Sequence, residues 1–404
     1  MLQIKFKLKL TMKKLLLKSI VFLSIASSII ACSTTEDNGP TSTFVVNAAD
    51  FKGTINDGEV VLDANVTYNL TGALIIADGA TLTIPAGTEV LATGGTSAYI
   101  AVAQGGKLFV NGTATNPVVF TSGNAVQAPG DWGGLVICGK APINTVSGGA
   151  GTAQSEVADL TYGGTISNDN SGSIRYLRLE YTGANFSATK EFNGVSLFGV
   201  GSGTTFEYVQ CYHGSDDGFE FFGGSVNTSN LVSFGNEDDQ FDWTEGWNGT
   251  NTNWYGKVFF GKGNRGIEAD NYEFGFTNTP VSNPTITNIT LVGPGSSPTP
   301  ALNYAENSGC KFRRGTKASL SNAYISGFAA IFDVEHDETI SFVGTDLKAT
   351  NVNLFDFINK TKGKKTDATS ADVSAIIISE SATATGAGNN ADLPTWAANW
   401  TIAN

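Results

Sequence analysis

The sequence has few of the residues on which several common kinds of active site depend. Only two histidines, His213 and His336, occur among its 404 residues, and they stand far apart in the chain. A zinc site needs clustered ligands and a Ser-His-Asp triad needs a placed histidine, so neither can be argued from this sequence. No glycine-rich phosphate loop lies between a strand pattern and a helix pattern, and we therefore expect no nucleotide cofactor.

Cysteine is scarce as well. Apart from Cys32, near the N-terminus, the chain has only Cys138, Cys211 and Cys310. An odd number of cysteines does not make a disulfide framework, and each of these three lies in or beside a strand pattern. We expect them to be buried free thiols.

Charged residues make up only 15% of the chain, and basic residues are the rarer kind, so the formal net charge is −13. Removing the six lysines of residues 1–31, a segment without acidic residues, changes that charge to −19. A chain this acidic would repel nucleic-acid phosphates, so we expect no nucleic-acid partner. The charge favours cations or neutral sugars as ligands, or simply solubility.

Glycine is abundant, with 48 residues against 11 prolines, and it follows no strict triplet that would indicate collagen. This composition is typical of many short strands joined by tight turns and argues against a helical protein.

One stretch in the middle of the chain occurs twice. Residues 216–221 (Asp-Asp-Gly-Phe-Glu-Phe) are matched by residues 238–243 (Asp-Asp-Gln-Phe-Asp-Trp), 22 positions later. Both copies alternate large apolar with acidic residues, which is the period of a strand with one buried face. A fixed period of this length indicates a solenoid. We predict an all-β, right-handed, single-stranded parallel β-helix in which residues 22 positions apart become neighbours.

Three segments support this fold by resemblance. Residues 73–88 run from an apolar strand through Asp-Gly-Ala to Thr-Leu-Thr-Ile-Pro-Ala-Gly-Thr, which resembles the opening turn of right-handed parallel β-helix proteins of the pectin lyase-like kind. Together with residues 130–139 and 162–181, this resembles a family of Bacteroidota surface lipoproteins with β-helix folds. The resemblance extends over about residues 60–345 and implies the fold rather than any chemistry.

Residues 1–31 have the pattern of an export signal. Six lysines surround or precede an apolar run that is too short to span a membrane with these flanks. The run ends in Ile-Ile-Ala before Cys32, which resembles the lipobox of bacterial lipoproteins and implies cleavage before Cys32 and its acylation. A plain secretory signal is the alternative.

Residues 32–43 are polar and form the lipidated tether of this interpretation. The acidic pair Glu36-Asp37 resembles the surface-export signal of Bacteroidota lipoproteins, although ordinary linker composition would look the same. We therefore expect a lipoprotein held in the outer membrane by its N-terminal lipid and exposed at the cell surface. Residues 44–404 form the β-helix domain, with an N-terminal cap at 44–70 and a C-terminal cap at 360–404, where Trp396 and Trp400 seal the last coil.

The alternation assigns acidic side chains to the outside of the coil. The predicted outward file comprises Glu220, Asp242, Glu268, Arg313 and Asp333. Two bare carboxylates at the strand spacing of about 4.8 Å repel by roughly 1 kcal/mol in water, so the file needs a cation, a basic neighbour or raised pKa values. The nearest basic residues in the sequence are Lys262, Arg265, Arg313 and Arg314.

Three interpretations of these carboxylates compete. The first is a solvated acidic face with local ion pairs. The second is a calcium site formed by Asp216, Asp217, Asp238 and Asp239 on adjacent turns, although no known calcium-binding repeat is present. The third is glycoside cleavage by Asp216, Asp217 and Asp239, because paired carboxylates hydrolyse sugars. His213-Gly214 beside Asp216-Asp217 resembles motifs of β-helix polygalacturonases, but the motifs are closer together here and the Arg-Ile-Lys signature is missing.

A second candidate site is the aromatic turn at residues 243–255, where Trp247 and Trp254 stand among Asn and Thr. Exposed Trp side chains with polar rims form flat platforms for sugar rings or a protein partner. The alternative is that these rings fold back onto the coil. The predicted ligand-binding residues are thus Glu220, Asp242, Trp247, Trp254 and Glu268. We expect a non-catalytic role, binding a glycan or an outer-membrane protein, with a polysaccharide-degrading enzyme as the alternative.

Overall fold

The structure is a computed structural model that describes residues 40–259, 261–297 and 306–403. The predicted export signal, Cys32 and residues 32–39 of the tether lie outside the described residues. Within the described part of the chain, no helix is long and apolar enough to cross a membrane.

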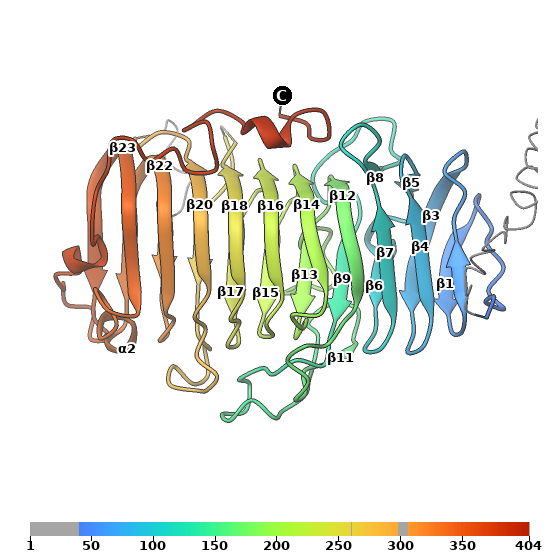
Figure 1. The fold of residues 1–404 in the computed structure, drawn as a ribbon, viewed down its shortest axis with the longest axis horizontal. Helices are drawn as coiled ribbons and strands as arrows, with labels where there is room; N and C mark the ends of the chain where they lie inside the picture. Colours follow the sequence, from blue (N-terminus) through green and yellow to red (C-terminus); the bar gives the residue numbers. More distant parts are fainter. Residues whose placement is uncertain (1–39, 260, 298–305, 404) are drawn as a thin grey trace, which may run out of the picture. The chain divides into compact units, whose positions relative to one another are not determined.

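The described chain is almost entirely β-structure, wound into successive coils (Figure 1). Its strands are β1 (Phe51–Ile55), β2 (Glu59–Val61), β3 (Thr67–Ile76), β4 (Thr81–Pro85), β5 (Glu89–Ala92), β6 (Tyr99–Val102), β7 (Lys107–Asn111), β8 (Val118–Ser122), β9 (Leu135–Cys138), β10 (Ala153–Gln154), β11 (Thr161–Tyr162), β12 (Gly172–Glu180), β13 (Val195–Phe198), β14 (Thr205–Tyr212), β15 (Phe219–Phe222), β16 (Asn227–Phe234), β17 (Phe241–Thr244), β18 (Thr250–Lys257), β19 (Ile267–Ala269), β20 (Thr285–Val292), β21 (Ser308–Phe312), β22 (Ala318–Glu335) and β23 (Leu347–Lys364). A short helix, α2 (Asp337–Ile340), follows β22.

All of these strands except β10 and β11 join one 21-stranded sheet, in which each strand pairs in parallel with the equivalent strand of the next coil. The sheet wraps around the coil axis as three faces. The third face, which carries the acidic file, runs through the second half of β3, then β6, β9, β13, β15, β17, β19, β21 and the last parts of β22 and β23. This architecture confirms the predicted right-handed parallel β-helix.

The repeat at residues 216–221 and 238–243 is one coil, as predicted. Phe219 pairs with Phe241 and Glu220 with Asp242 in the parallel ladder between β15 and β17. The rings of Phe219 and Phe241 are stacked with centroids 5.6 Å apart, and both side chains are fully buried. Like residues on successive coils therefore stack to fill the interior, which is how a narrow solenoid buries enough apolar surface.

A column of asparagines holds one corner of the coils. Asn253, Asn288 and Asn322 all have left-handed backbones, with φ of 60°, 62° and 49°. Each stacks on the next through amide hydrogen bonds: Asn288 Nδ2 donates to Asn253 Oδ1 at 2.9 Å, and Asn322 Nδ2 donates to Asn288 Oδ1 at 2.8 Å. Asparagine tolerates this conformation better than most residues, and the shared bonds offset its cost.

The C-terminal segment does not seal the last coil with its tryptophans, so that expectation is wrong. Trp400 is buried against Tyr176 and Tyr208 of β12 and β14, with ring centroids 5.8 and 6.0 Å apart. Ile402 donates its backbone N–H to Gln210 at 2.8 Å. The segment lies along the side of the coils (Figure 1) because it covers aromatic rings there. At the last coil, Ile377 and Glu380 bridge to β23 instead.

Candidate functional site: an acidic cleft on the third face

The structure contains the outward file, but one of its predicted residues is a different one. Glu220 of β15, Asp242 of β17 and Glu268 of β19 are in register on successive coils, and the file continues through Lys311 and Asp333. The prediction that Arg313 occupies this file is wrong. Cys310, not Phe312, stacks on Ile267, so Lys311 follows Glu268 and Arg313 lies one outward position further along the coil.

The carboxylates of the file differ in how they are compensated. Glu268 lies 2.8 Å from Arg265 and 2.7 Å from Arg313. Glu220 has no cationic partner among the described residues; its Oε2 accepts a hydrogen bond of 2.7 Å from Asn193. Asp242 has neither a hydrogen bond nor an ion pair with any described residue. Arg265 and Arg313 thus serve as the predicted basic neighbours of Glu268, but they form no ion pair with Glu220 or Asp242.

Burial and mutual repulsion act together on the uncompensated pair. Burial raises the pKa of Glu220 well above its usual value, and the nearby Asp242 carboxylate raises it further. Burial likewise raises the pKa of Asp242, with Glu268 adding to the shift. For Glu268, burial also raises the pKa, although Arg265 and Arg313 oppose it. A side chain that binds a proton this readily suits hydrogen bonding to ligand hydroxyls as either donor or acceptor.

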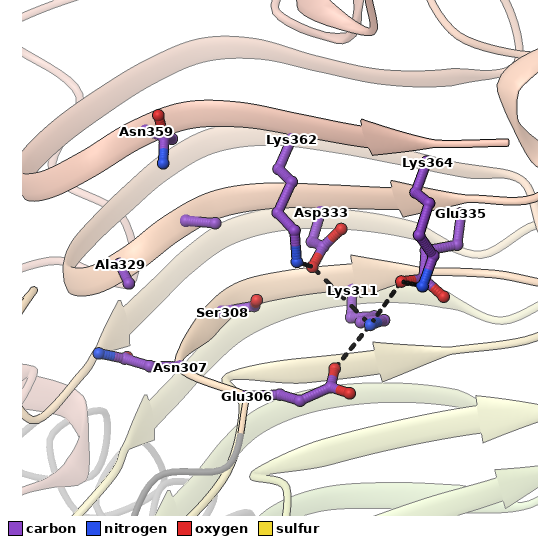
Figure 2. A pocket seen from close by; sticks show the side chains of 11 residues that line it. Glu306, Asn307, Ser308, Lys311, Ala329, Asp333, Glu335, Asn359, Lys362 and Lys364 are labelled. Atoms are coloured by element: carbon purple, nitrogen blue, oxygen red, sulfur yellow. Dashed lines mark hydrogen bonds and ion pairs between the residues drawn. The ribbon is translucent and has the colours of Figure 1, made fainter. Parts of the chain in front are cut away.

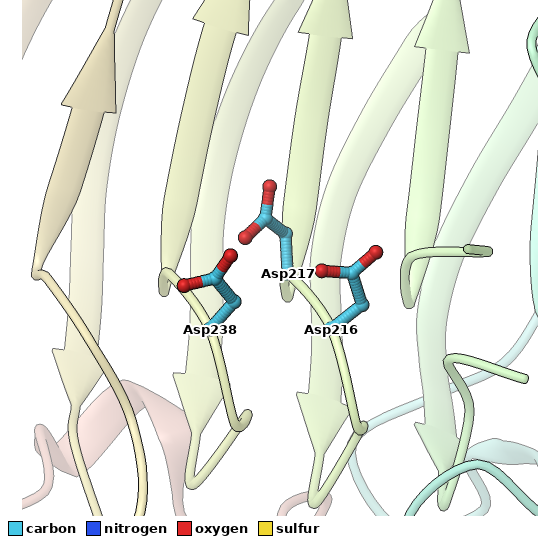
Figure 3. Close-up of side chains that lie close together, drawn as sticks. All are labelled: Asp216, Asp217 and Asp238. Carbon is cyan, nitrogen blue, oxygen red and sulfur yellow. The ribbon is translucent and has the colours of Figure 1, made fainter. Parts of the chain in front are cut away.

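The turns before β15 and β17 bring together three of the four predicted calcium ligands. Carboxylate oxygens of Asp216, Asp217 and Asp238 lie within 4.8 Å of one another, from two successive coils (Figure 3). Burial, followed by the charge of Asp238, raises the pKa of Asp216 to about 8. These oxygens are the kind of ligand that Ca²⁺ prefers. The cluster fits such an ion in donor type, and calcium binding stays a prediction.

Asp239 does not belong to this turn cluster. Its two carboxylate oxygens accept from Arg265, one from the backbone N–H at 2.7 Å and one from the guanidinium at 2.9 Å. Its oxygens approach Asp242 and Glu268 instead. A buried carboxylate held in this way serves as an anchor for Arg265 rather than as a free acid or base.

A cavity of about 290 Å³ opens over the file. Its lining contains seven carboxylic acids and two arginines, together with Thr244 and aromatic residues: Glu156, Glu220, Phe222, Asp242, Thr244, Glu245, Glu268, Asp270, Tyr272, Glu273, Phe274, Arg313 and Arg314. We refer to it as the acidic cleft. Asp216 and Asp217 do not line it, so the predicted catalytic pair lies outside the cleft.

Two excursions from the coil form the walls of the acidic cleft. Glu156 comes from the turn between β10 and β11, and Tyr272, Glu273 and Phe274 follow β19. The Tyr162 hydroxyl donates to Glu245 Oε2 at 2.7 Å. Burial raises the pKa of Glu245 to about 7, against the lowering effect of this hydrogen bond. The cleft therefore holds a carboxyl group that is partly protonated at neutral pH.

The arginines in the acidic cleft are tied down by neighbouring carboxylates. Arg313 contacts Asp270 at 3.0 Å as well as Glu268, and Arg314 also contacts Asp270. Their charges are therefore shared with Glu268 and Asp270, and in the outward file Glu220 and Asp242 form no ion pair with any described residue.

Trp247 and Trp254 do not form an exposed platform, so this prediction is wrong. Both side chains are 0% exposed. Trp247 stacks on Phe221 with centroids 4.0 Å apart, and Trp254 stacks on Phe241 at 4.4 Å. Their indole N–H groups donate inside the coil, to Val226 O and Thr228 Oγ1. Both rings thus belong to the interior stack of the coil and offer no surface to a ligand.

The exposed aromatic group of the site is one that the sequence did not single out. Phe274 is 79% exposed on the rim of the acidic cleft, and its ring lies against Tyr272 with centroids 5.5 Å apart. Glu156, Glu245 and Glu273 were also missed because they lie in turns and excursions without the 22-residue period. Asp270 could have been found, since it is one outward position after Glu268.

A solenoid of stacked parallel coils with a polar cleft on one face defines the class of protein as a parallel β-helix. A family model described as a pectate-lyase-like beta helix domain matches residues 53–401, so the chain belongs to that family. Searches of curated proteins and of solved structures gave no match.

Proposed function

We propose that this protein binds a neutral polysaccharide in the acidic cleft without cleaving it, while anchored to the outside of the outer membrane by a lipid on Cys32. The observation that carries the proposal is the pairing of an exposed ring with open carboxyl groups. Phe274 stands at the rim, and Glu220 and Asp242 lie in the cleft without an ion pair to any described residue. A ring that stacks on a sugar face, beside acceptors for its hydroxyls, is a common way to hold a glycan.

The charge of the acidic cleft supports a neutral glycan over an acidic one. Seven carboxylic acids face only two arginines, and both arginines are already paired. A polyuronate entering this cleft would add like charges in a partly desolvated space, which costs several times more than in water. A divalent cation bridging the two would be needed for such a ligand.

The test is a binding screen with the mature protein against neutral and acidic oligosaccharides. We expect a neutral class to bind, and Phe274→Ala to weaken it about tenfold, which corresponds to about 1.4 kcal/mol. Phe355→Ala is the matched control because Phe355 is also exposed, at 50%, but does not line the cleft. Binding only of polyuronates, or equal loss in both variants, would overturn the proposal.

A polysaccharide-degrading role is the second candidate, and Glu245 is the observation that favours it. With a pKa of about 7, Glu245 could act as a general acid beside the other carboxylates of the cleft. This candidate predicts that new reducing ends appear when the mature protein is incubated with its glycan. It also predicts that Glu245→Gln abolishes their appearance while binding remains.

A further inference from the structure

A second cavity lies further along the third face, over β21, β22 and β23. Its volume is about 370 Å³, within the range of small-molecule sites. Polar side chains and two alanines line it: Glu306, Asn307, Ser308, Lys311, Ala329, Ala330, Asp333, Glu335, Asn359, Lys362 and Lys364. We refer to it as the lysine cavity.

Its charged residues neutralise one another (Figure 2). Lys311 contacts Glu306 at 2.6 Å and Glu335 at 3.0 Å, and its side chain is nearly buried. Lys362 contacts Asp333 at 2.8 Å, and Lys364 contacts Glu335 at 2.6 Å. Three ammonium groups thus match three carboxylates, in contrast to the excess of acid in the acidic cleft.

Two acceptor atoms at the lysine cavity remain without partners among the described residues. Asp333 is only 1% exposed, and its Oδ1 receives no hydrogen bond. Asn307 Oδ1 is also buried and receives no hydrogen bond from a described residue. A buried acceptor left without a donor costs about 1–3 kcal/mol, so such groups usually indicate a missing partner.

The missing partner must donate hydrogen bonds and tolerate ammonium groups. A metal ion is disfavoured by Lys311 and Lys362 beside Asp333. An anion would bring a further negative charge to a lining whose lysines are already neutralised. A hydroxyl group satisfies both demands, because it donates to a carboxylate or amide oxygen and accepts from an ammonium group.

We propose that the lysine cavity is a subsite for a neutral hexose unit of the glycan held in the acidic cleft. Sugar hydroxyls would donate to Asn307 and Asp333 and accept from Lys362, whose side chain is 55% exposed. This inference rests on the proposed function. It adds a second point of contact and therefore a minimum length for the ligand.

The two sites are neighbours along the outward file. Glu268 of the acidic cleft is in register with Lys311 of the lysine cavity on the adjacent strand. From Glu220 to Lys362 the file crosses β15, β17, β19, β21, β22 and β23. At about 4.8 Å between strands this is a span of roughly 24 Å, which only an extended oligosaccharide can cover.

The experiment measures affinity as a function of chain length. Neutral gluco-, manno-, xylo- and galacto-oligosaccharides, from disaccharide to octasaccharide, are titrated calorimetrically into the mature protein. We expect the octasaccharide of the recognised series to bind at least about tenfold more tightly than its disaccharide. Lys362→Met and Asn307→Ala should each remove this gain, while Phe274→Ala should weaken every length.

Lys360→Met is the matched control, since Lys360 is on the same strand as Lys362 but pairs with Glu380 and does not line the lysine cavity. It should leave the gain with length intact. If Asn307 were only a structural defect, its replacement would leave affinity unchanged. Length-independent affinity, or a gain that survives in Lys362→Met and Asn307→Ala, overturns the subsite but not the proposed function. If no neutral oligosaccharide binds at any length, both fail.

Discussion

Replacing Asp242 with asparagine should stabilise the protein, and the effect should grow with pH. Asp242 makes no hydrogen bond or ion pair with any described residue, so an asparagine of the same shape gives up no contact. Two carboxylates about 4.8 Å apart repel by about 1 kcal/mol in water and by about 3.5 kcal/mol at an effective dielectric constant of 20. The relief comes from the neighbouring carboxylates, of which Glu268 has the largest effect on Asp242, and Glu220 also lies close to it.

The pH dependence follows from the direction of the pKa shift. Burial and Glu268 raise the pKa of Asp242 in the folded protein, so over this range the folded state binds a proton that the unfolded state has released. The contribution of this proton to the free energy of unfolding is fully present below about pH 4. It is lost as the pH rises through the pKa of Asp242 in the folded protein, at up to about 1.4 kcal/mol per pH unit. Asp242→Asn removes this loss.

The assay is urea unfolding of wild type and Asp242→Asn at acid, neutral and alkaline pH. We expect the free energies of unfolding to converge at low pH and to differ by at least about 1 kcal/mol in favour of the variant at high pH. Asp346→Asn is the control, and its effect on the free energy of unfolding should have the opposite sign because Lys317 lowers the pKa of Asp346. It should be destabilising at neutral pH and silent in acid. A wild type whose stability rises from neutral to alkaline pH, or a destabilised Asp242→Asn, refutes the reasoning.

Four further outcomes are expected. Asn288→Ala should lower the free energy of unfolding by about 2 kcal/mol, from two lost side-chain bonds and a strained left-handed backbone, and Asn288→Gly by less; equal losses would contradict the role of the backbone. Trp254→Ala should cost about 3–5 kcal/mol in urea unfolding yet leave glycan affinity unchanged in protein that remains folded, whereas a selective loss of affinity would restore the platform hypothesis. Millimolar Ca²⁺ should raise the melting temperature reversibly with chelator, and should fail to do so in Asp216→Asn. Cys32→Ser should abolish incorporation of labelled fatty acid in cells, and continued labelling would rule out Cys32 as the lipid site.

The sequence was informative where the chain repeats. β15 and β17 belong to consecutive coils of equal length, so the offset between Asp216 and Asp238 directly gave the ladder and the inward stacking of Phe219 on Phe241. Between β19 and β21 the coil contains a long excursion, and the register was then misjudged by two residues at Arg313.

The residues that form the walls of the acidic cleft could not be predicted from the sequence. Glu156 and Phe274 lie in excursions whose paths depend on tertiary packing, so no spacing in the sequence associates them with Glu220. The polar neighbours of Trp247 and Trp254 in the sequence suggested exposed rings, whereas both rings are buried inside the coil. The free energy gained by burying a large ring decides its position, whatever the polarity of its neighbours in the sequence.

Repeat proteins commonly fray from an end, since each coil contacts only its neighbours. Here the tail of the chain returns to the middle, where Ile402 bonds to Gln210 and Trp400 covers Tyr176. The last coils could therefore separate from the rest only if the contacts of the C-terminal tail with Gln210 and Tyr176 were broken as well. The molecule should therefore unfold as a single unit, and removal of the last dozen or so residues should turn one sharp transition into a gradual one.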